Sequence, residues 1–419
     1  MPEPNQPLTL SKTNITNIDG HSVKVPVNVM LRMLPSPEVV FESDHLPTLL
    51  LRNVEQGNKV ELENGTEIDV LLNSMNSSGS GSLIPSRQPV MALDEGRPIQ
   101  SVRFSVINLS FFYGGQDKWV QAGDSKVLVP HTQMETSRWS IQIAADEGYA
   151  EIEKLLRKSR GHAITHTGVI GGKDSKAFSK EDVQTITDGL RVFLSFAHGS
   201  HVGISHVEGL DFNGEPSLIQ WGPRYTAPWI SRQSWCPRMA GGDVLQELFP
   251  GFWQLFTQEG WNETIRRVID WYLQGNESRF VDSSIVFNQV ALECLSHRIL
   301  SGGDSKKAAG YRISKALKES GIDDSAIPES LPVLRSLSAK KGWKGGAHAI
   351  TEMRNSTVHA DNSSGGFSLD GCFEASALGQ WYIELILLSL FGYTGKYRNR
   401  LLIRSGSYPV EDVPWVNQA

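Results

Sequence analysis

The chain has 419 residues, of which 39% are hydrophobic and 21% charged, as in soluble globular proteins of two or three domains. Forty Lys and Arg against 46 Asp and Glu give a net charge of −6, which excludes a general polyanion binder and leaves only a local basic patch. The 3 cysteines are far apart and form no CxxC pair, so we expect no disulfide framework and a cytoplasmic location.

No membrane or secretory segment is expected. The first residues lack the basic and apolar regions of a secretory signal. The most apolar run, Trp381–Tyr393, is too short to cross a bilayer and contains Glu384, so it predicts a buried helix.

The first 150 residues predict strands. Runs such as HSVKVPVNVML and SRWSIQIAA carry β-branched and aromatic residues near period two, which favours a sandwich or barrel. Between such runs, the Ser- and Gly-rich stretch Asn73–Ser86 is expected to be a flexible loop.

The period then becomes helical over Asp182–Ala197, with Gly199 suited to end the helix. A strand-like run, His201–Phe212, follows. The aromatic run Trp221–Trp235 is interpreted as domain core or interface in preference to a ligand platform. We therefore assign residues 1–240 to a β-rich, α+β regulatory or sensor domain.

Residues 241–419 predict an all-helical bundle, because short connections favour antiparallel packing. The expected helices are Asp243–Gln258, Asn262–Gln274, Asp282–Leu300, Ser305–Ser320, Gly345–Ala360 and Glu374–Phe391. Between Arg298 and Arg354 there are 11 basic and 6 acidic residues, a local excess of 11 − 6 = 5 positive charges.

The segment TEMRNSTVHADNSSGG carries the candidate chemistry in Arg354, Asn355 and His359. Five residues of helix turn by about 140° and rise about 7.5 Å, so Arg354 and His359 of one copy cannot converge tightly on one point. Asn355 and His359 share a face. Two such helices meeting across a two-fold axis would form one cleft. The loop residues after Ala360 are expected to end the helix, leaving His359 where the macrodipole favours imidazolium.

The Arg–His spacing alone is not specific. Arg157 and His162 have the same spacing in the N-terminal half and are interpreted as a chance match. For an unplaced pair, a surface arginine with a buried histidine is the ordinary alternative.

In its C-terminal part, the chain resembles HEPN domains, helical bundles of many prokaryotic RNases whose signature is Arg, a polar residue, three residues and His. Flanking runs Val286–Leu300 and Leu378–Leu401 support the resemblance. Upstream, HAITHTGVI, Phe178–Gly199, GLDFNGE and FPGFWQLF resemble ApeA-like anti-phage proteins, so the likeness spans His162–Arg404.

The resemblance implies that Arg354 and His359 are the catalytic pair and Asn355 their polar companion. It implies a ribonuclease toxin of anti-phage defence that leaves a 2′,3′-cyclic phosphate and a 5′-hydroxyl. Some HEPN toxins carry Tyr two residues after the His, where this chain has Asp361.

The residue chemistry suits this assignment. Histidine can move the 2′-OH proton near neutral pH, and arginine offers a planar fork of donors to phosphate. Lys340, Lys341 and Lys344, with Trp343 among them, can steer and stack single-stranded RNA; the ordinary alternative is a solvated loop.

Two further patterns are weaker. His198, His201, His206 and Glu208 have a metal-like composition but irregular spacing, so no metal or other cofactor is expected. The stretch Gly168–Lys173 is one residue short of a phosphate-binding loop and is interpreted as a turn.

The sequence therefore predicts a metal-independent endoribonuclease, homodimeric, acting on RNA such as tRNA or mRNA, with a phage-derived trigger sensed by the N-terminal domain. The alternative is a catalytically silent HEPN module that dimerises and recruits a partner. Retention of Arg354, Asn355 and His359 together favours the enzyme.

Overall fold

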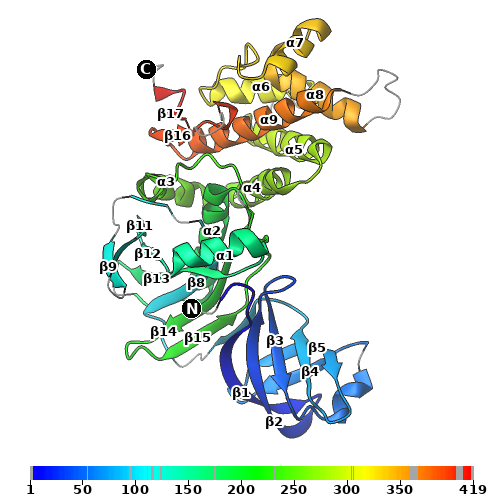
Figure 1. Ribbon diagram of the computed structural model, residues 1–419, viewed down its shortest axis with the longest axis vertical. Helices are drawn as coiled ribbons and strands as arrows, with labels where there is room; N and C mark the ends of the chain where they lie inside the picture. The colour runs from blue at the N-terminus through cyan, green and yellow to red at the C-terminus, as the bar shows by residue number, and fades with distance from the viewer. Residues whose placement is uncertain are drawn as a thin grey trace. The chain divides into compact units, whose positions relative to one another are not determined.

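The computed structural model describes residues 3–53, 55–93, 97–110, 112–114, 118–122, 125–173, 176–230, 232–302, 304, 306–358, 367–402 and 409–416. The chain forms two compact units. Unit 1 comprises Met1–Phe111, Gln116–Arg191 and His201–Ser231, and unit 2 comprises Phe112–Gly115, Val192–Ser200 and Arg232–Ala419. The fold is α+β, with a β-rich N-terminal region and a helical C-terminal region (Figure 1).

Unit 1 begins with a closed antiparallel barrel in the order β1-β2-β3-β6-β5-β4. Its elements are β1 (Leu8–Ile18), β2 (His21–Arg32), β3 (Glu38–Ser43), η1 (Thr48–Asn53), β4 (Asn58–Leu62), β5 (Glu67–Met75) and β6 (Gly81–Pro85). Alternate residues of β2, from Val25 to Leu31, are buried, as strand geometry requires of a one-sided core. Of the two folds expected for this region, a sandwich or a barrel, the barrel is present.

The stretch Asn73–Ser86 was wrongly expected to be a loop. It contains the end of β5 and all of β6, joined by a turn. Ser82 is buried, yet it receives a hydrogen bond from Asn73 Nδ2 at 2.9 Å and lies 2.9 Å from Ser74 Oγ. Side-chain hydrogen bonds between β5 and β6 therefore stabilise β6, although its polar sequence does not suggest a strand.

The second part of unit 1 is a seven-stranded antiparallel sheet in the order β11-β12-β13-β8-β14-β15-β7. Its strands are β7 (Val90–Leu93), β8 (Ser101–Ile107), β11 (His131–Glu135), β12 (Trp139–Ala145), β13 (Ile164–Gly172), β14 (Gly203–Leu210) and β15 (Pro216–Trp221). The hairpin β9 (Lys118–Ala122) and β10 (Ser125–Val129), the helix α1 (Tyr149–Ser159) and the first part of α2 (Lys180–His198) complete this region; the residues of α2 from Val192 belong to unit 2.

Two sequence predictions concern this region, one for helix α2 and one for strand β13. Helix α2 confirms the helical period, and Gly199, with φ +81°, lies directly after it. The stretch Gly168–Lys173 is no turn: residues to Gly172 belong to β13. Gly168 faces Phe104 on β8, and a Cβ there would lie 2.2 Å from Phe104 Cζ. The absence of a side chain at Gly168 therefore leaves room for the Phe104 ring, and the stretch does not form a phosphate-binding loop.

Unit 2 is a helical assembly. Its helices are α3 (Gly241–Phe256), α4 (Trp261–Glu277), α5 (Val281–Ile299), α6 (Ala309–Glu319), α7 (Pro332–Lys341), α8 (Gly345–Val358) and α9 (Leu369–Leu390). β16 (Lys396–Arg398), η2 (Arg400–Leu402) and β17 (Val410–Asp412) follow α9. Helix α9 packs against α3, α4, α5, α7 and α8, and it is buried around most of its circumference. The short helix α7 was not predicted.

The expected buried helix contains an ion pair. Glu384 of α9 is fully buried, and its Oε2 accepts a 2.9 Å hydrogen bond from Arg400 Nε. Tyr272 OH donates to Glu384 Oε1 at 2.6 Å. Mutual pairing makes the burial of Glu384 and Arg400 tolerable.

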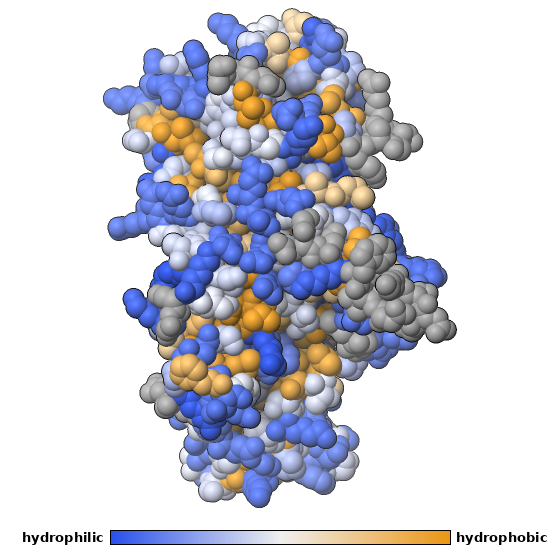
Figure 2. All heavy atoms as spheres, turned by 90° about the vertical axis from the view of Figure 1, so that its left-hand side faces the viewer, coloured by the Kyte–Doolittle hydropathy of each residue, from blue (hydrophilic) through white to orange (hydrophobic). Residues whose placement is uncertain are grey.

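The face drawn in Figure 2 is mainly hydrophilic, with apolar residues in several separate patches. Among the described residues, no helix has the length and apolarity required to cross a membrane.

Candidate active site

Helix α8 carries the candidate motif, and its N-terminus is fixed by a buried carboxylate. Asp324 Oδ1 accepts hydrogen bonds from the backbone N–H of Ala347, at 2.9 Å, and from Tyr382 OH, at 2.8 Å. Gly345 has φ +83°, and a Cβ there would lie 2.0 Å from Asp324 O. Only glycine permits this close approach at the start of α8.

Burial raises the pKa of the Asp324 carboxyl, although hydrogen bonds from Ala347 and Tyr382 act in the opposite direction. A buried carboxylate at a helix N-terminus is favoured by the exposed N–H groups of the first turn. The contact therefore fixes α8 against α9.

The exposure of α8 residues separates a packing face from a polar face. Ala347, Ile350 and Met353 are fully buried. Arg354 and Asn355 are partly exposed near the C-terminal end of the helix. The structure therefore places these two motif residues at an accessible edge of the helical unit.

Arg354 retains hydrogen-bonding capacity. Its Nη1 lies 3.4 Å from Asn355 Oδ1, a long hydrogen bond. Its Nε is buried and has no hydrogen-bond partner among the residues the structure describes. The Arg354 side chain is partly exposed, and its Nη2 makes no hydrogen bond to a described residue, so the guanidinium keeps a donor for an oxyanion.

His359 lies outside the described residues, as do Ala360 and Asp361. Helix α8 is described as far as Val358. The proposed approach of Asn355 and His359, and the end of the helix near Ala360, stay predictions.

The basic segment follows α7. Lys340 and Lys341 lie in its last turn, where cations complement the helix dipole. Lys340, Lys341 and Lys344 are exposed, and they form no ion pair within the described parts of the chain. They are available to a polyanion.

Trp343 is partly buried by a specific contact. Its ring lies edge-on to Phe367, with 5.8 Å between centroids and 72° between planes. At the other end of α7, Glu374 Oε2 of α9 accepts from Leu334 N at 2.6 Å. Both ends of α7 are thus tied to the start of α9, which holds the lysines on an ordered support.

Sequence reasoning missed His348. It lies seven residues before Asn355, nearly two helical turns, and so occupies the same side of α8. Its Nδ1 accepts a 3.0 Å hydrogen bond from Lys344 N, and its Nε2 lies 3.8 Å from Glu352 Oε1. A ring whose Nδ1 accepts carries its proton on Nε2. The four-residue spacing of His348 and Glu352, which places them on one face of a helix, was the signal that the sequence offered.

A polar chain links α8 to its neighbours. Gln289 Nε2 of α5 donates to Thr351 Oγ1 at 3.2 Å and to Glu293 Oε1 at 3.0 Å. Glu293 Oε2 in turn lies 3.5 Å from Arg312 Nη2 on α6. These bonds fix the rotation of α8, and hence the direction of Arg354.

The histidine cluster does not converge. His198 ends α2 and is buried, which lowers its pKa to about 4, with the nearby Arg238 charge acting in the same direction. His201 packs edge-on to Tyr225 at 5.0 Å. Within the described ranges, no group of three or more His, Cys, Asp or Glu residues is placed to hold a metal ion.

The remaining patterns have structural roles. Arg157 pairs with Glu153 at 2.7 Å on the surface of α1, whereas His162 is 1% exposed, so this pair forms no shared site. The tryptophans of the aromatic run are core, since Trp221 lies in the barrel cluster beside Phe41 and Trp229 and Trp235 are buried, whereas Tyr225 is 60% exposed.

The fold and site together define a protein with a β-rich N-terminal unit and a helical unit that carries a polar motif. Two family models match the chain: the YopA central domain over residues 94–232 and the YopA C-terminal domain over residues 258–411. The chain is 26% identical over 405 residues to the SPbeta prophage-derived uncharacterized protein YopA of Bacillus subtilis (strain 168), covering 92% of this chain and 90% of that protein. No solved structure matches it.

Proposed function

We propose that the chain is a metal-independent endoribonuclease of HEPN type. The observation that carries the proposal is Arg354: its side chain is partly exposed, its hydrogen bond within the described residues is the long contact to Asn355, and it lies five residues before His359 in the sequence. The motif therefore supplies a cation for a phosphate and, within a pair of copies, a residue able to transfer protons.

In this mechanism, His359 removes the proton from the ribose 2′-OH, which attacks the adjacent phosphorus. Arg354 stabilises the charge that develops on the phosphate oxygens, and Asn355 orients the phosphate or the imidazole. Expulsion of the 5′-oxygen leaves a 2′,3′-cyclic phosphate and a 5′-hydroxyl. Lys340, Lys341 and Lys344 attract the RNA strand, with Trp343 beside them.

The active form is a homodimer. On a helix that continues to His359, Arg354 and His359 would lie about 140° apart, so a second copy is needed to enclose a phosphate. Val358, Leu369 and Phe373, which flank residues 359–366 in the sequence, are 49%, 63% and 57% exposed. Exposed apolar side chains of this kind are typical of interaction surfaces, which supports a symmetric interface at this end of α8 and α9.

In the cell, the protein acts in the cytoplasm as an anti-phage toxin on tRNA or mRNA. Unit 1 senses a phage-derived trigger and regulates cleavage. The name of the relative refers to a prophage, and competition between phages in one host provides a setting for such a toxin.

A second candidate is a silent HEPN module that dimerises and recruits a partner. The exposed apolar residues near the motif favour it, because recruitment needs a surface and no chemistry.

One experiment separates these two functions. The purified protein is incubated with total RNA in EDTA, and the new RNA ends are sequenced. The enzyme generates cyclic-phosphate ends that are lost in His359→Ala, whereas Arg157→Ala, with its paired surface arginine, retains activity. Intact RNA, or equal cleavage by His359→Ala, supports the silent module.

A further inference from the structure

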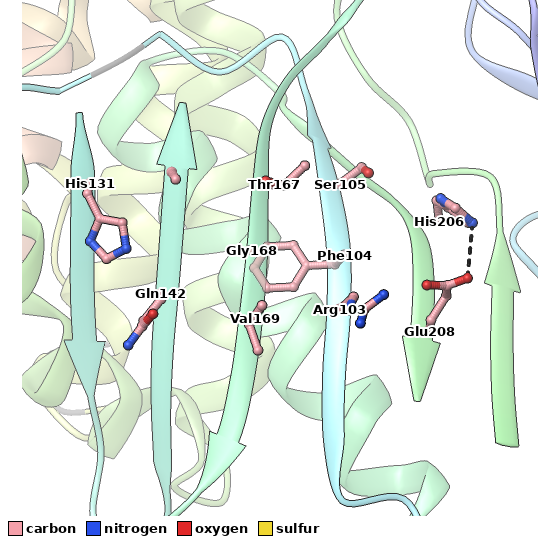
Figure 3. Close-up of a pocket in the computed structure, with 11 residues that line it drawn as sticks. Arg103, Phe104, Ser105, His131, Gln142, Thr167, Gly168, Val169, His206 and Glu208 are labelled. Atoms are coloured by element: carbon pink, nitrogen blue, oxygen red, sulfur yellow. Dashed lines mark ion pairs between the residues drawn. The ribbon is translucent and has the colours of Figure 1, made fainter. Parts of the chain in front are cut away.

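A pocket lies on one face of the seven-stranded sheet of unit 1. Its volume is about 420 Å³, within the range of roughly 300–1,000 Å³ for small-ligand sites. Residues of β11, β12, β13, β8 and β14 line it, and Figure 3 shows their side chains on these five strands.

The exposure pattern identifies the face. On β8, Arg103 is exposed, whereas Val102 and Phe104 are 0% and 2% exposed. On β13, Thr167 and Val169 are exposed, whereas Ile170 is buried. Since successive strand residues point to opposite faces, the exposed set shares the side that bears the pocket.

A β-bulge brings two further groups to this face. Ser205 pairs with Ser105 and Glu208 with Arg103, so β14 has one residue more than β8 between these pairs. His206 lies in the bulge with φ +49°, a left-handed conformation uncommon for residues other than glycine. As a result, His206 and Glu208 both line the pocket, with Nε2 and Oε1 3.5 Å apart. A strained bulge beside a pocket is typical of functional sites.

Arg103 lies near the middle of this constellation, opposite Val169 on one neighbouring strand and Glu208 on the other. It forms no ion pair with any residue that the structure describes, although Glu208 lies on the adjacent strand; the carboxylate is instead near His206. Gln142 and Thr167 likewise make no side-chain hydrogen bond within the described ranges and line the same pocket. A guanidinium, an amide and a hydroxyl are thus available together.

The lining favours a small molecule over an RNA strand. Recognition of single-stranded RNA on a sheet relies on exposed aromatic rings. The aromatic ring among the lining residues belongs to Phe104, which is 2% exposed and packs on Gly168.

We propose that this pocket binds a phosphorylated small molecule, with Arg103 and His206 as ligands of its phosphate. Arginine presents paired N–H donors that match phosphate oxygens. Glu208, Gln142 and Thr167 contact the hydroxyl or ring N–H groups of the same ligand. Val169 and Ala144 form an apolar part of the wall. This site is independent of the proposed RNA cleavage.

The test is calorimetric titration of the full chain with inorganic phosphate, ribose 5-phosphate, adenosine 5′-monophosphate and adenosine. We expect ribose 5-phosphate or the nucleotide to bind and adenosine not to bind. Tighter binding of the nucleotide assigns a base-recognising site, and equal binding of the two assigns a sugar phosphate site.

Three variants locate the binding. Arg103→Gln should weaken it about 10- to 100-fold, the effect of losing charge-assisted hydrogen bonds. His206→Gly should also weaken it without unfolding the sheet, because glycine tolerates the positive φ. The control Arg87→Gln changes an exposed arginine of unit 1 outside the pocket and should bind normally. Failure of all three phosphates to bind at millimolar concentration, or unchanged binding by Arg103→Gln, overturns the proposal.

Discussion

Asp324 and Tyr382 are joined by a 2.8 Å hydrogen bond beneath the first turn of α8. The same carboxylate oxygen accepts from the Ala347 N–H, so one buried group connects the motif helix to the central helix α9. The position of Arg354 therefore depends on a contact well removed from the motif itself.

Variants of Asp324 should separate its hydrogen bonds from its charge. Asp324→Ala leaves the Ala347 N–H and Tyr382 OH without their acceptor and should cost about 1–3 kcal/mol of unfolding free energy. Asp324→Asn retains an acceptor oxygen and removes the buried charge, so it should be at least as stable as the wild type at pH 7.

The pH dependence follows from the raised pKa of Asp324. A raised folded-state pKa favours the protonated folded form, so its contribution is fully present below the ordinary value of about 3.9 and is lost as pH rises through the folded-state value. Relative to wild type, Asp324→Asn should therefore gain stability as the pH rises above about 4. Urea denaturation across this range measures it; an Asp324→Asn protein as unstable as Asp324→Ala at pH 7 would contradict the account.

Two glycines of β13 provide a matched test of sheet packing. Gly168→Ala places a Cβ 2.2 Å from the Phe104 ring and should destabilise unit 1 by about 1–3 kcal/mol. At Gly171 a Cβ meets nothing within 4 Å, so Gly171→Ala should change stability by less than about 0.5 kcal/mol. Equal denaturation midpoints for the two variants would show that the close packing of Phe104 on Gly168 is unimportant.

The basic segment should contribute binding energy that depends on salt. Replacing Lys340, Lys341 and Lys344 together by Gln should weaken RNA binding, and the slope of log K against log salt should fall by about 2, at roughly 0.7 per phosphate contact. Fluorescence anisotropy with labelled single-stranded RNA measures both quantities. As a control, Gln replacement of the exposed residues Lys12, Lys24 and Lys158 changes the net charge by the same amount and should leave the slope unchanged. An equal fall in the slope for both triple variants would show that the basic segment does not contact the RNA.

The proposed dimer should share one site between two copies. Mixing Arg354→Ala with His359→Ala protomers should restore part of the RNA cleavage, because a mixed dimer retains one arginine and one histidine. Light scattering at micromolar concentration should show a dimer that Phe373→Glu weakens, since Phe373 is an exposed apolar residue near the start of α9. A strictly monomeric protein that cleaves RNA would rule out the shared site.

Sequence patterns predicted the division into a β-rich and a helical region, and the motif helix is confirmed from Gly345 to Val358. Local periodicity was sufficient there, because each pattern extends over several turns or strands. Strand β6 was not predicted, because Gly81 and Ser82 are residues typical of loops. In the structure, a Cβ on Gly81 would lie 2.1 Å from Ser74 O on the neighbouring strand. That glycine permits close strand approach, a requirement visible only once the strands are paired.

The pocket on the seven-stranded sheet could not be predicted from local sequence patterns either. It depends on the pairing of β8 with β13 and β14, segments far apart in the sequence, and on a bulge at His206. The sequence did single out His206 and Glu208, but grouped them with His198 and His201, which have separate, buried environments.

The most direct test of the central claim is the rate of RNA cleavage by purified wild-type, Arg354→Ala and His359→Ala proteins in excess EDTA. The account predicts cleavage by the wild type without metal, and a loss of at least about 10²–10³-fold in each variant, as expected when transition-state charge stabilisation or proton transfer is removed. Arg157→Ala, which changes a surface arginine paired with Glu153 on α1, should retain cleavage. Undiminished cleavage by either Arg354→Ala or His359→Ala would contradict it.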